Sequence, residues 1–487
     1  MMTRTLCVLL ALLLSLLVAG AAATEGDNLT INTTVVATPA ASPTAELLWQ
    51  TTYDGSASSS LLALLPGPEG GYLLVGASTA AAGGNGELTL VRTDGSGTHL
   101  RSSRLPFGLS GSGRANAASL TRDGGVAAVG STRSVAAGDE DVFLLRLRAD
   151  GTSLWGRSYA IGSGIDVGDA VVPATDGGFI VAGTTASSTG GTTGLLLLKV
   201  DEAGGQLWHR VHSLGANRLI VHDLQATSDG GYLLVGSTDA NHPGSLDVLL
   251  MKFTAGGSRE WQQTFAAGSG SAVGYALEPS PDGGYVLLGA VEGSGTLSSA
   301  AVLIGTDTAG RERWRTRLAV GNATPTRGYD LGAVGDRGYL VVGETGASAA
   351  TRSFAALVDR SGRELWNRTY SVGEATDSAR ALTVAGAGRY VVAGNAASSA
   401  DGSSRLYLVA VSPPSAAPNA TANATPTANV TPAFTANTTP VVTATGTPVE
   451  TAPAEPTGSV PTRAPLGLVP ALASLAAVGL LTAFRRR

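Results

Sequence analysis

The sequence is poor in cysteine, lysine and charge of either sign. Among its 487 residues the only cysteine is Cys7, in an apolar run at the N-terminus, and the only lysines are Lys199 and Lys252. Charged residues make up 14% of the chain and the net charge is -5. Because no basic stripe exists, nucleic acid is not an expected partner. If the N-terminal run is removed, the mature chain has no disulfide and no thiol, so its stability must come from its core.

Aromatic residues are also scarce, at 5% of the chain, whereas 66 residues are glycine. Small residues, threonine and serine dominate the remainder. This composition favours many short β-strands joined by tight turns over long helices.

One phrase occurs seven times. It consists of an acidic residue, a Gly-Gly turn, a short apolar run and a closing glycine, and the turn is degenerate in the last two copies. Successive closing glycines are 51 to 54 residues apart, a period that predicts a stacked or circular array of similar units. The closing glycines are Gly76, Gly130, Gly183, Gly236, Gly289, Gly343 and Gly394.

Each unit contains four short β-rich runs. In the third unit an Asp-Gly-Gly turn at residues 176–178 separates two apolar runs, and a second turn at 201–205 leads into the run that contains Trp208. Turns of this kind between apolar runs predict β-hairpins, because they need positive φ. We therefore expect each unit to form one four-stranded sheet.

The tryptophans occupy equivalent positions in the last run of the unit, and one further copy has Arg101 there instead. The first copy of this run precedes the first Gly-Gly turn, so the last sheet lacks its own copy. Residues 47–53 can supply it and close a ring without free sheet edges. We predict an all-β, seven-bladed β-propeller of four-stranded blades over residues 47–411, with an open solenoid as the alternative. The tryptophans, expected on outermost strands against the next blade, are Trp49, Trp155, Trp208, Trp261, Trp314 and Trp366.

The two ends of the chain predict export and membrane attachment. Residues 1–23 have the basic start, apolar core and small residues of a secretory signal peptide, and residues 24–46 form a linker. Residues 464–487 contain an uncharged stretch, long enough for a transmembrane helix, followed by three arginines. Because positive charge stays inside, the rest of the chain is expected on the extracellular face of the cell membrane.

Residues 412–463 consist largely of Pro, Thr, Ala, Val and Asn. Such a segment cannot bury enough apolar surface to fold, and its prolines keep it extended, so it predicts a disordered stalk. Asn-X-Thr sequons, concentrated in this stalk and the linker, make the chain a predicted glycoprotein. They are Asn28, Asn32, Asn322, Asn367, Asn419, Asn423, Asn429 and Asn437.

The C-terminal end resembles the sorting signals of archaeal surface proteins that are processed by archaeosortases (PGF-CTERM type). The match consists of Pro465-Leu-Gly467, the apolar run and the arginines at 485–487, after a Thr/Pro-rich spacer. The Pro-Gly-Phe of that signal is not present. The resemblance implies an archaeal protein attached to the cell surface.

The repeat itself resembles the propeller repeats of extracellular archaeal and bacterial proteins with the Asp-Gly-Gly-Tyr phrase. The hairpin at residues 359–366, Asp-Arg-Ser-Gly-Arg-Glu-Leu-Trp, is also similar to blades of pyrroloquinoline-quinone dehydrogenases. That family has eight blades and an adjacent-Cys disulfide at its cofactor site, which a mature chain without cysteine cannot form. No cofactor is therefore expected.

No catalytic motif is present: the sequence lacks Gly-X-Ser-X-Gly, a phosphate loop and His-Glu-X-X-His. Four of the five histidines fall within residues 209–242, and we expect none of them to bind a metal. Aspartates near the start of the innermost strands would surround a central channel, where they could bind a cation or sugar hydroxyls. They could equally hydrogen-bond turns or strand starts. These weak candidates are Asp166, Asp169, Asp223, Asp330 and Asp377.

Three classes of function follow. The leading one is a stalked propeller without enzymatic activity, acting as a binding, adhesion or cell-envelope structural module, with surface glycans or envelope proteins as partners. The second is an extracellular polysaccharide lyase or glycosidase, which would need paired carboxylates or an Arg/Tyr cluster on one face. The third is a quinone-dependent dehydrogenase.

Overall fold

The computed structural model describes residues 46–412, with gaps at 54–58, 68–69, 80–85, 109–112, 134–139, 163, 187–192, 216–217, 267–269, 294–298, 319, 321–324, 348–349, 374, 387 and 398–402. The predicted signal peptide and membrane anchor lie outside the described residues, and so does the predicted stalk except Ser412, the last residue of the propeller. So do all predicted glycosylation sites except Asn367.

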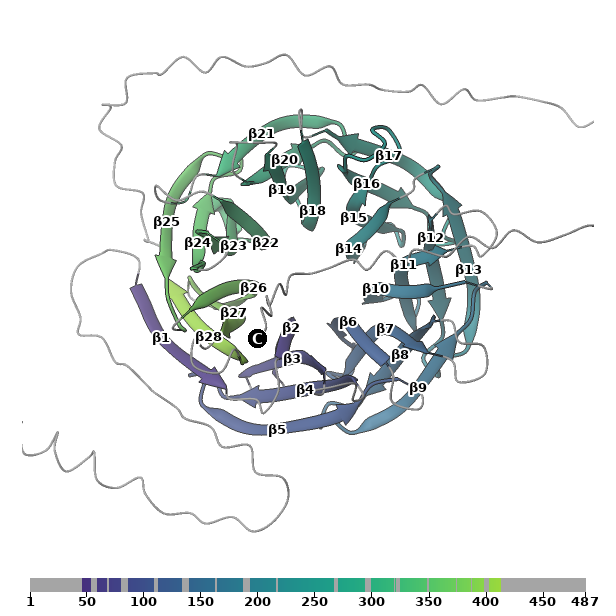
Figure 1. The fold of residues 1–487 in the computed structure, drawn as a ribbon, viewed down its shortest axis with the longest axis horizontal. Helices are drawn as coiled ribbons and strands as arrows, with labels where there is room; N and C mark the ends of the chain where they lie inside the picture. The colour runs from purple at the N-terminus through teal and green to yellow at the C-terminus, as the bar shows by residue number, and fades with distance from the viewer. Residues whose placement is uncertain are drawn as a thin grey trace, which may run out of the picture. The chain divides into compact units, whose positions relative to one another are not determined.

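Seven four-stranded antiparallel sheets are arranged in a ring, like the blades of a propeller (Figure 1). In six sheets the strands follow one another in the sequence, and the first lies nearest the axis of the ring. The only helical segment within the described ranges is a 3-10 turn, η1 (Gly335–Arg337), and no helix in this part of the chain is long and apolar enough to cross a membrane. The structure confirms the predicted all-β, seven-bladed propeller.

The blades are numbered along the chain. Blade 1 comprises β2 (Ser59–Pro66), β3 (Tyr72–Thr79), β4 (Gly86–Thr93) and β5 (His99–Pro106). Blade 2 comprises β6 (Gly113–Leu120), β7 (Val126–Arg133), β8 (Glu140–Leu147) and β9 (Ser153–Tyr159). Blade 3 comprises β10 (Asp166–Pro173), β11 (Phe179–Ala186), β12 (Thr193–Val200) and β13 (Gln206–Ser213). Blade 4 comprises β14 (Leu219–Ala226), β15 (Tyr232–Thr238), β16 (Asp247–Phe253) and β17 (Arg259–Phe265).

The remaining blades follow the same order, except the last. Blade 5 comprises β18 (Gly270–Pro279), β19 (Tyr285–Gly293), β20 (Ala300–Thr306) and β21 (Glu312–Leu318). Blade 6 comprises β22 (Thr326–Ala333), β23 (Tyr339–Thr345), β24 (Arg352–Val358) and β25 (Glu364–Tyr370). Blade 7 comprises β26 (Thr376–Gly386), β27 (Arg389–Ala397), β28 (Ser404–Ser412) and the N-terminal strand β1 (Glu46–Tyr53).

The N-terminal strand closes the ring, as the sequence predicts. Strand β1 pairs antiparallel with β28, from Glu46 opposite Ser412 to Tyr53 opposite Leu406. The last sheet therefore has the order β1-β28-β27-β26. Backbone hydrogen bonds join the two ends of the array, so β28 is not left as a free sheet edge.

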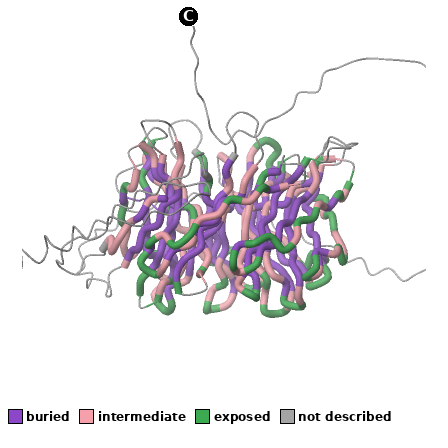
Figure 2. Tube along the Cα trace, turned by 90° about the horizontal axis from the view of Figure 1, so that it is seen from below, coloured by how far each residue is buried: buried purple, intermediate pink, exposed green. Residues whose placement is uncertain are grey.

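The core lies between the blades. The middle strands are buried, whereas the turns at the rims are exposed (Figure 2). Each of the seven hydrophobic clusters among the described residues joins two neighbouring blades. In one of them, Ile180 and Leu197 of blade 3 pack with Leu234 and Met251 of blade 4. Because both faces of a middle strand are covered, its sequence is a continuous apolar run.

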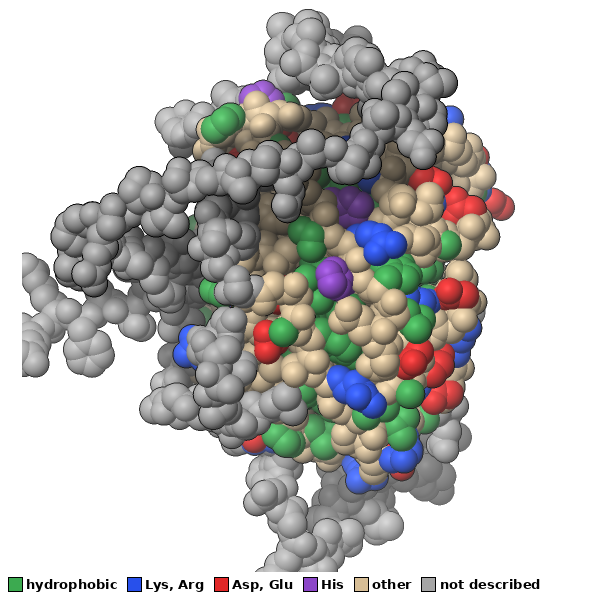
Figure 3. Space-filling model, turned by 90° about the vertical axis from the view of Figure 1, so that its right-hand side faces the viewer, with side chains coloured by type: hydrophobic (Ala, Val, Ile, Leu, Met, Phe, Trp, Pro, Cys, Tyr) green, Lys and Arg blue, Asp and Glu red, His purple; other side chains and the backbone are tan. Residues whose placement is uncertain are grey.

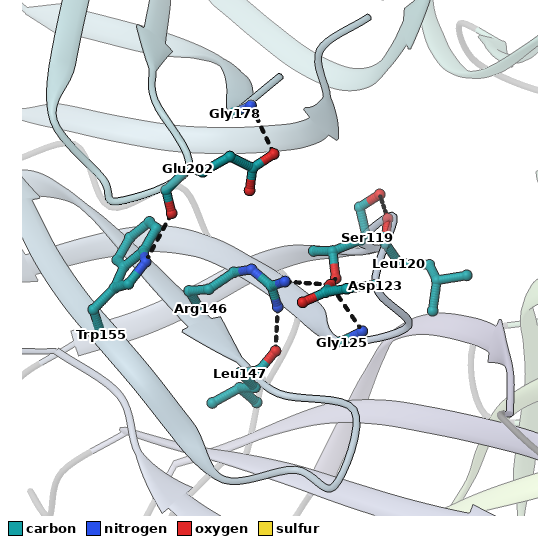
Figure 4. Close-up of polar contacts among 10 residues, drawn as sticks. Ser119, Leu120, Asp123, Gly125, Arg146, Leu147, Trp155, Gly178 and Glu202 are labelled. Atoms are coloured by element: carbon teal, nitrogen blue, oxygen red, sulfur yellow. Dashed lines mark hydrogen bonds and ion pairs between the residues drawn. The ribbon is translucent and has the colours of Figure 1, made fainter. Parts of the chain in front are cut away.

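Buried cations hold the Asp-Gly-Gly turns of three blades. Lys199, Lys252 and Arg146 lie on the third strands of their blades, and each pairs with the aspartate of its own turn. Lys252 Nζ lies 2.8 Å from the carboxylate of Asp229. In blade 2, Arg146 also donates to the carbonyl of Leu147 (Figure 4). Both lysines of the chain thus have a structural role, since a buried cation needs a partner.

The tryptophans lie on outer strands, and five of the six pack against a turn glycine of the next blade. A Cβ on Gly257 would lie 2.6 Å from the indole ring of Trp208, and the φ of 77° at Gly257 also favours glycine. The indole of Trp155 donates to the carbonyl of Glu202 in blade 3, at 3.1 Å (Figure 4). Trp366 packs on the cluster between blades 6 and 7. In five blades the outer turn is therefore also a contact site for the preceding blade.

Two substitutions test the contact between neighbouring blades. Trp208→Ala removes a half-buried ring, and we expect the free energy of unfolding to fall by about 2–3 kcal/mol. Gly257→Ala puts a methyl group against the indole at positive φ, with an expected loss of about 1–2 kcal/mol. In the double variant this clash is absent, so the two losses should not add. Denaturant titration measures all four proteins, and strictly additive losses would contradict the contact.

Removing residues 46–53 tests the closure of the ring. Without β1, strand β28 has an unpaired edge and the cluster between blades 7 and 1 loses Tyr53. We expect the thermal unfolding midpoint to fall by several degrees. Removing residues 24–45 instead is the control and should leave the midpoint unchanged. Equal midpoints for the two truncations would show that β1 does not close the ring.

Candidate functional site

The closing glycine of each repeat lies opposite a bulge in the innermost strand. In all seven blades the first and second strands shift register by one residue at the same place. In blade 3, Gly183 pairs with Gly168 just before the shift, and a Cβ on Gly183 would overlap the carbonyl oxygen of Val167. The closing glycines of blades 2, 4, 6 and 7 meet the same obstacle. Glycine therefore permits the close approach at which the bulge forms.

Each bulge places one residue at an equivalent position, fourteen residues before the closing glycine, as Asp169 precedes Gly183. The innermost strands surround the axis of the ring (Figure 1), so the seven bulge residues encircle it. We call them the axial residues. They are Leu62, Asn116, Asp169, His222, Tyr275, Tyr329 and Arg380. The backbone frame repeats seven times, whereas the side chain at this position changes from blade to blade.

Four axial residues, from blades 4 to 7, contact one another in turn. The ring centroids of His222 and Tyr275 are 4.8 Å apart, and those of Tyr275 and Tyr329 are 5.2 Å apart. Cζ of Arg380 lies 3.8 Å from the centroid of the Tyr329 ring. These distances are typical of aromatic pairs and of cation–π stacking. The four side chains form a continuous surface across four blades, which we call the axial wall.

One carboxylate lies beside this wall and contacts it. Glu344, on β23, accepts a hydrogen bond from the hydroxyl of Tyr329 at 2.7 Å and lies 3.6 Å from Nη1 of Arg327. Its negative charge is therefore compensated within blade 6. Burial raises the pKa of Tyr329, and the hydrogen bond to Glu344 acts in the same direction, so the phenol stays protonated at neutral pH.

Other polar groups of the wall have no protein partner within the described residues. Arg380 is exposed and makes no ion pair there, and neither the hydroxyl of Tyr275 nor the imidazole of His222 makes a hydrogen bond to any described residue. Burial lowers the pKa of His222 to about 4, so its imidazole is neutral at pH 7. A ligand at the axis would thus meet a free guanidinium, a phenol and a neutral imidazole.

The opposite side of the axis is held by its own hydrogen bonds. Nδ2 of Asn116 donates to the carbonyl of Gly168 at 3.0 Å and to the carboxylate of Asp169 at 3.3 Å. Burial raises the pKa of Asp169 to about 7, partly offset by the charge of Arg114. Of the five predicted aspartates, Asp169 is the only axial residue.

Asp223 and Asp330 tie neighbouring blades together. Each directly follows an axial residue and accepts a backbone N–H from the innermost strand of the next blade: Leu277 at 3.1 Å and Leu382 at 2.8 Å, respectively. Each also accepts the N–H of its own following residue. Burial raises the pKa of Asp223 to about 6 and that of Asp330 to about 8.

Asp166 and Asp377 hold the loops that lead into the innermost strands of blades 3 and 7. Both are fully buried. Asp166 accepts the backbone N–H of Ile161 at 2.8 Å, and Asp377 accepts those of Val372 at 2.9 Å and Gly373 at 2.7 Å. These bonds fit the structural alternative that the sequence left open, a carboxylate at a strand start.

Sequence reasoning missed the axial wall. His222 was considered only as a possible metal ligand, and Tyr275, Tyr329 and Arg380 were not singled out. The available signal was positional: each lies fourteen residues before a closing glycine. For metals, the described ranges contain no group of three or more His, Cys, Asp or Glu side chains that could hold an ion.

The outer surface offers no equally specific candidate for a binding site among the described residues. The side of the molecule seen in Figure 3 carries basic, acidic, apolar and neutral polar side chains interspersed. Exposed apolar side chains do occur on outer strands, such as Leu207 and Val211 on β13, but single exposed apolar residues are common on protein surfaces. The axis is therefore the more specific candidate.

No known family model matches the sequence, and no curated protein matches it. Solved structures of similar architecture include a protein of unknown function from Dyadobacter fermentans, with 11% identity, a TM-score of 0.42, and coverage of 76% of this chain and 99% of that one. The β-propeller domain of the Trilobed protease from Pyrococcus furiosus has 8% identity and a TM-score of 0.40, covering 73% and 94%. The α-L-arabinofuranosidase Arb93A of Fusarium graminearum has 9% identity and a TM-score of 0.41, covering 61% and 91%.

These likenesses concern the fold alone. The ring has seven blades, whereas the resemblance to quinone-dependent dehydrogenases implies eight. The chain is thus a β-propeller. The axial residues of blades 4 to 7 contact one another, whereas Asn116 and Asp169 on the other side of the axis form a hydrogen bond of their own.

The stability of the ring should depend on pH through Asp330. Its pKa of about 8 in the folded ring lies above the value of about 3.9 in an unfolded chain. Between these values the folded state holds a proton that the unfolded state has lost. The free energy of unfolding therefore falls as pH rises from about 4 to about 8, by at most about 1.4 kcal/mol per pH unit from this group.

Asp330→Ala should make this slope shallower. Alanine is the residue at the equivalent position of five other blades: Ala63, Ala117, Ala170, Ala276 and Ala381. Denaturant titrations at several pH values compare the variant with the parent protein. An unchanged slope would contradict the raised pKa.

Proposed function

We propose that this protein is a binding module displayed on the outer face of a cell membrane, and that its ligand binds at the axial wall. The observation that carries the proposal is the wall itself: four contacting side chains on blades 4 to 7, including polar groups without a protein partner in the described part of the chain. His222 and Tyr275 are half-buried and Arg380 is exposed, so these polar groups are accessible to a ligand.

The repeating frame does not require these side chains. The same backbone bulge carries leucine in blade 1 and asparagine in blade 2. The aromatic and cationic residues of blades 4 to 7 are therefore free to serve recognition, which uses aromatic and arginine side chains preferentially.

The flanking segments support display at the cell surface. The signal peptide at residues 1–23, the Pro/Thr-rich stalk at 412–463 and the anchor at 464–487 are all expectations from the sequence. A ring on an extended tether would meet surface glycans or proteins of the envelope. Adhesion or cohesion of the envelope is the role that we propose for it.

Cleavage of polysaccharides is the second candidate. It is favoured by the Arg/Tyr cluster, and by His222, whose neutral imidazole could accept a proton beside Tyr275. The raised pKa values of Tyr275 and Tyr329 argue against either phenol as a base. Binding without turnover therefore ranks first.

An array of cell-surface glycans probed with the purified full chain, together with an assay for released sugar, tests this proposal. We expect binding without release. Tyr275→Ala should weaken binding at least about tenfold, since it removes the centre of the wall. Leu62→Ala changes an axial residue outside the wall and should leave binding intact. Release of sugar that depends on His222 would favour the enzyme instead.

A further inference from the structure

We propose that the ligand of the axial wall is a carboxylated saccharide, held by its carboxylate on Arg380 and by a sugar ring against Tyr275. This inference rests on the proposed binding function and adds the chemical class of the ligand. It is argued from the stacking of Arg380, from the charges around the wall and from its aromatic surface.

The stacking of Arg380 leaves its hydrogen-bond donors available. With Cζ 3.8 Å from the centroid of the Tyr329 ring, the face of the guanidinium is occupied by the phenol. The N–H donors of a guanidinium lie in its plane and point outward from its edge. That edge is the part that binds a carboxylate through two parallel hydrogen bonds. The tyrosine thus orients the arginine without using its donors.

The charge of Arg380 is also uncompensated at close range. A second guanidinium beside the wall, that of Arg327, lies 3.6 Å from Glu344. Glu344 is in turn engaged by Tyr329. Arg380 is exposed and forms no ion pair among the described residues. An incoming anion would therefore be drawn to Arg380 rather than to Arg327.

The wall is nevertheless not a site for a polyanion. Charges of both signs lie within electrostatic reach of Tyr275, namely Arg380, Arg327, Glu292 and Glu344, and Glu344 is already paired with Arg327. Arg380 is the only guanidinium among the four residues of the wall, and its edge can pair with one carboxylate, so a saccharide with one carboxylate per ring and hydroxyls elsewhere fits the wall better than a densely charged ligand. This mixture of charges favours a carboxylated sugar.

The remaining surface of the wall suits a sugar ring. Tyr275 lies between His222 and Tyr329 in the row of aromatic rings, and binding sites typically combine an apolar face with a few polar groups. Its hydroxyl and the neutral imidazole of His222 have no hydrogen-bond partner in the described part of the chain and can exchange hydrogen bonds with sugar hydroxyls.

Calorimetric titration of the full chain tests the ligand class. The probes are tetrasaccharides of galacturonate, glucuronate and mannuronate, their methyl esters, the sulfated glucose tetramer and the neutral glucose tetramer. We expect at least one carboxylated probe to bind and its methyl ester to bind at least about tenfold more weakly, because the ester lacks the charge that pairs with Arg380. Added salt should weaken the binding.

Substitutions of Arg380 test whether it contacts the carboxylate of the ligand. Arg380→Met should lower the affinity for the carboxylated probe at least about tenfold. Arg380→Lys should give an intermediate affinity, because lysine keeps the positive charge but not the two parallel N–H donors of the guanidinium. Arg101→Met is the matched control: it removes one exposed guanidinium from outer strand β5 and should change nothing. Unfolding midpoints of the variants verify that the ring is intact.

Each other outcome overturns the inference. If the neutral tetramer binds and depends on Tyr275 but not on Arg380, the ligand class is wrong while the binding function stands. Equal affinity for sulfated and carboxylated probes, both lost in Arg380→Met, would show a general anion site. If Arg101→Met weakens binding as much as Arg380→Met, the ligand does not lie at the axis.

The titrations and the glycan array together separate the ligand class from the binding function. If no titration probe binds but the array captures other glycans, the carboxylated saccharide is rejected and the binding function stands. If neither experiment detects binding, the binding function is rejected too.

Discussion

The close approach between the two innermost strands of each blade is the constraint on which the rest of the structure depends. At the closing glycine, the second strand comes so near the carbonyl of the first that a Cβ would overlap it in most blades. The first strand bulges at this point in all seven blades. A bulge re-aims a side chain, and here the re-aimed side chains encircle the axis of the ring.

Stability and recognition therefore reside in different parts of the repeat. Stability comes from the clusters between blades, from the tryptophans on the next blade's turns and from the closing strand β1. None of these requires a particular residue at the axis, where blade 1 has Leu62 and blade 7 has Arg380. An axial side chain can change without loss of the frame, which is how one repeat can support a wall of unlike residues.

The sequence predicted the frame well because the frame is periodic. The period of the closing glycines, the turn chemistry and the offset of the tryptophans define seven blades and their closure by residues 47–53. The burial of the two lysines could not be predicted from the sequence, because lysine is usually exposed. In the structure Lys199 and Lys252 are buried and pair with the aspartates of their turns.

The site was predicted poorly because it is not periodic. The aspartates drew attention as residue types with known chemistry, yet Asp166 and Asp377 hold loops, and Asp223 and Asp330 join blades. Residues 222, 275, 329 and 380 are far apart in the chain, and the one signal that they share is their spacing of fourteen residues before a closing glycine. Only the bulge brings them together, and a bulge depends on the pairing of two strands, not on one residue.

The most direct test of this account replaces all four residues of the axial wall with asparagine, the axial residue of blade 2, and measures thermal unfolding with and without the ligand found in the titrations. The account predicts that the unliganded ring unfolds within a few degrees of the parent protein, while the ligand no longer raises the midpoint. A collapse of the ring, or a midpoint that the ligand still raises, would contradict the separation of frame and site.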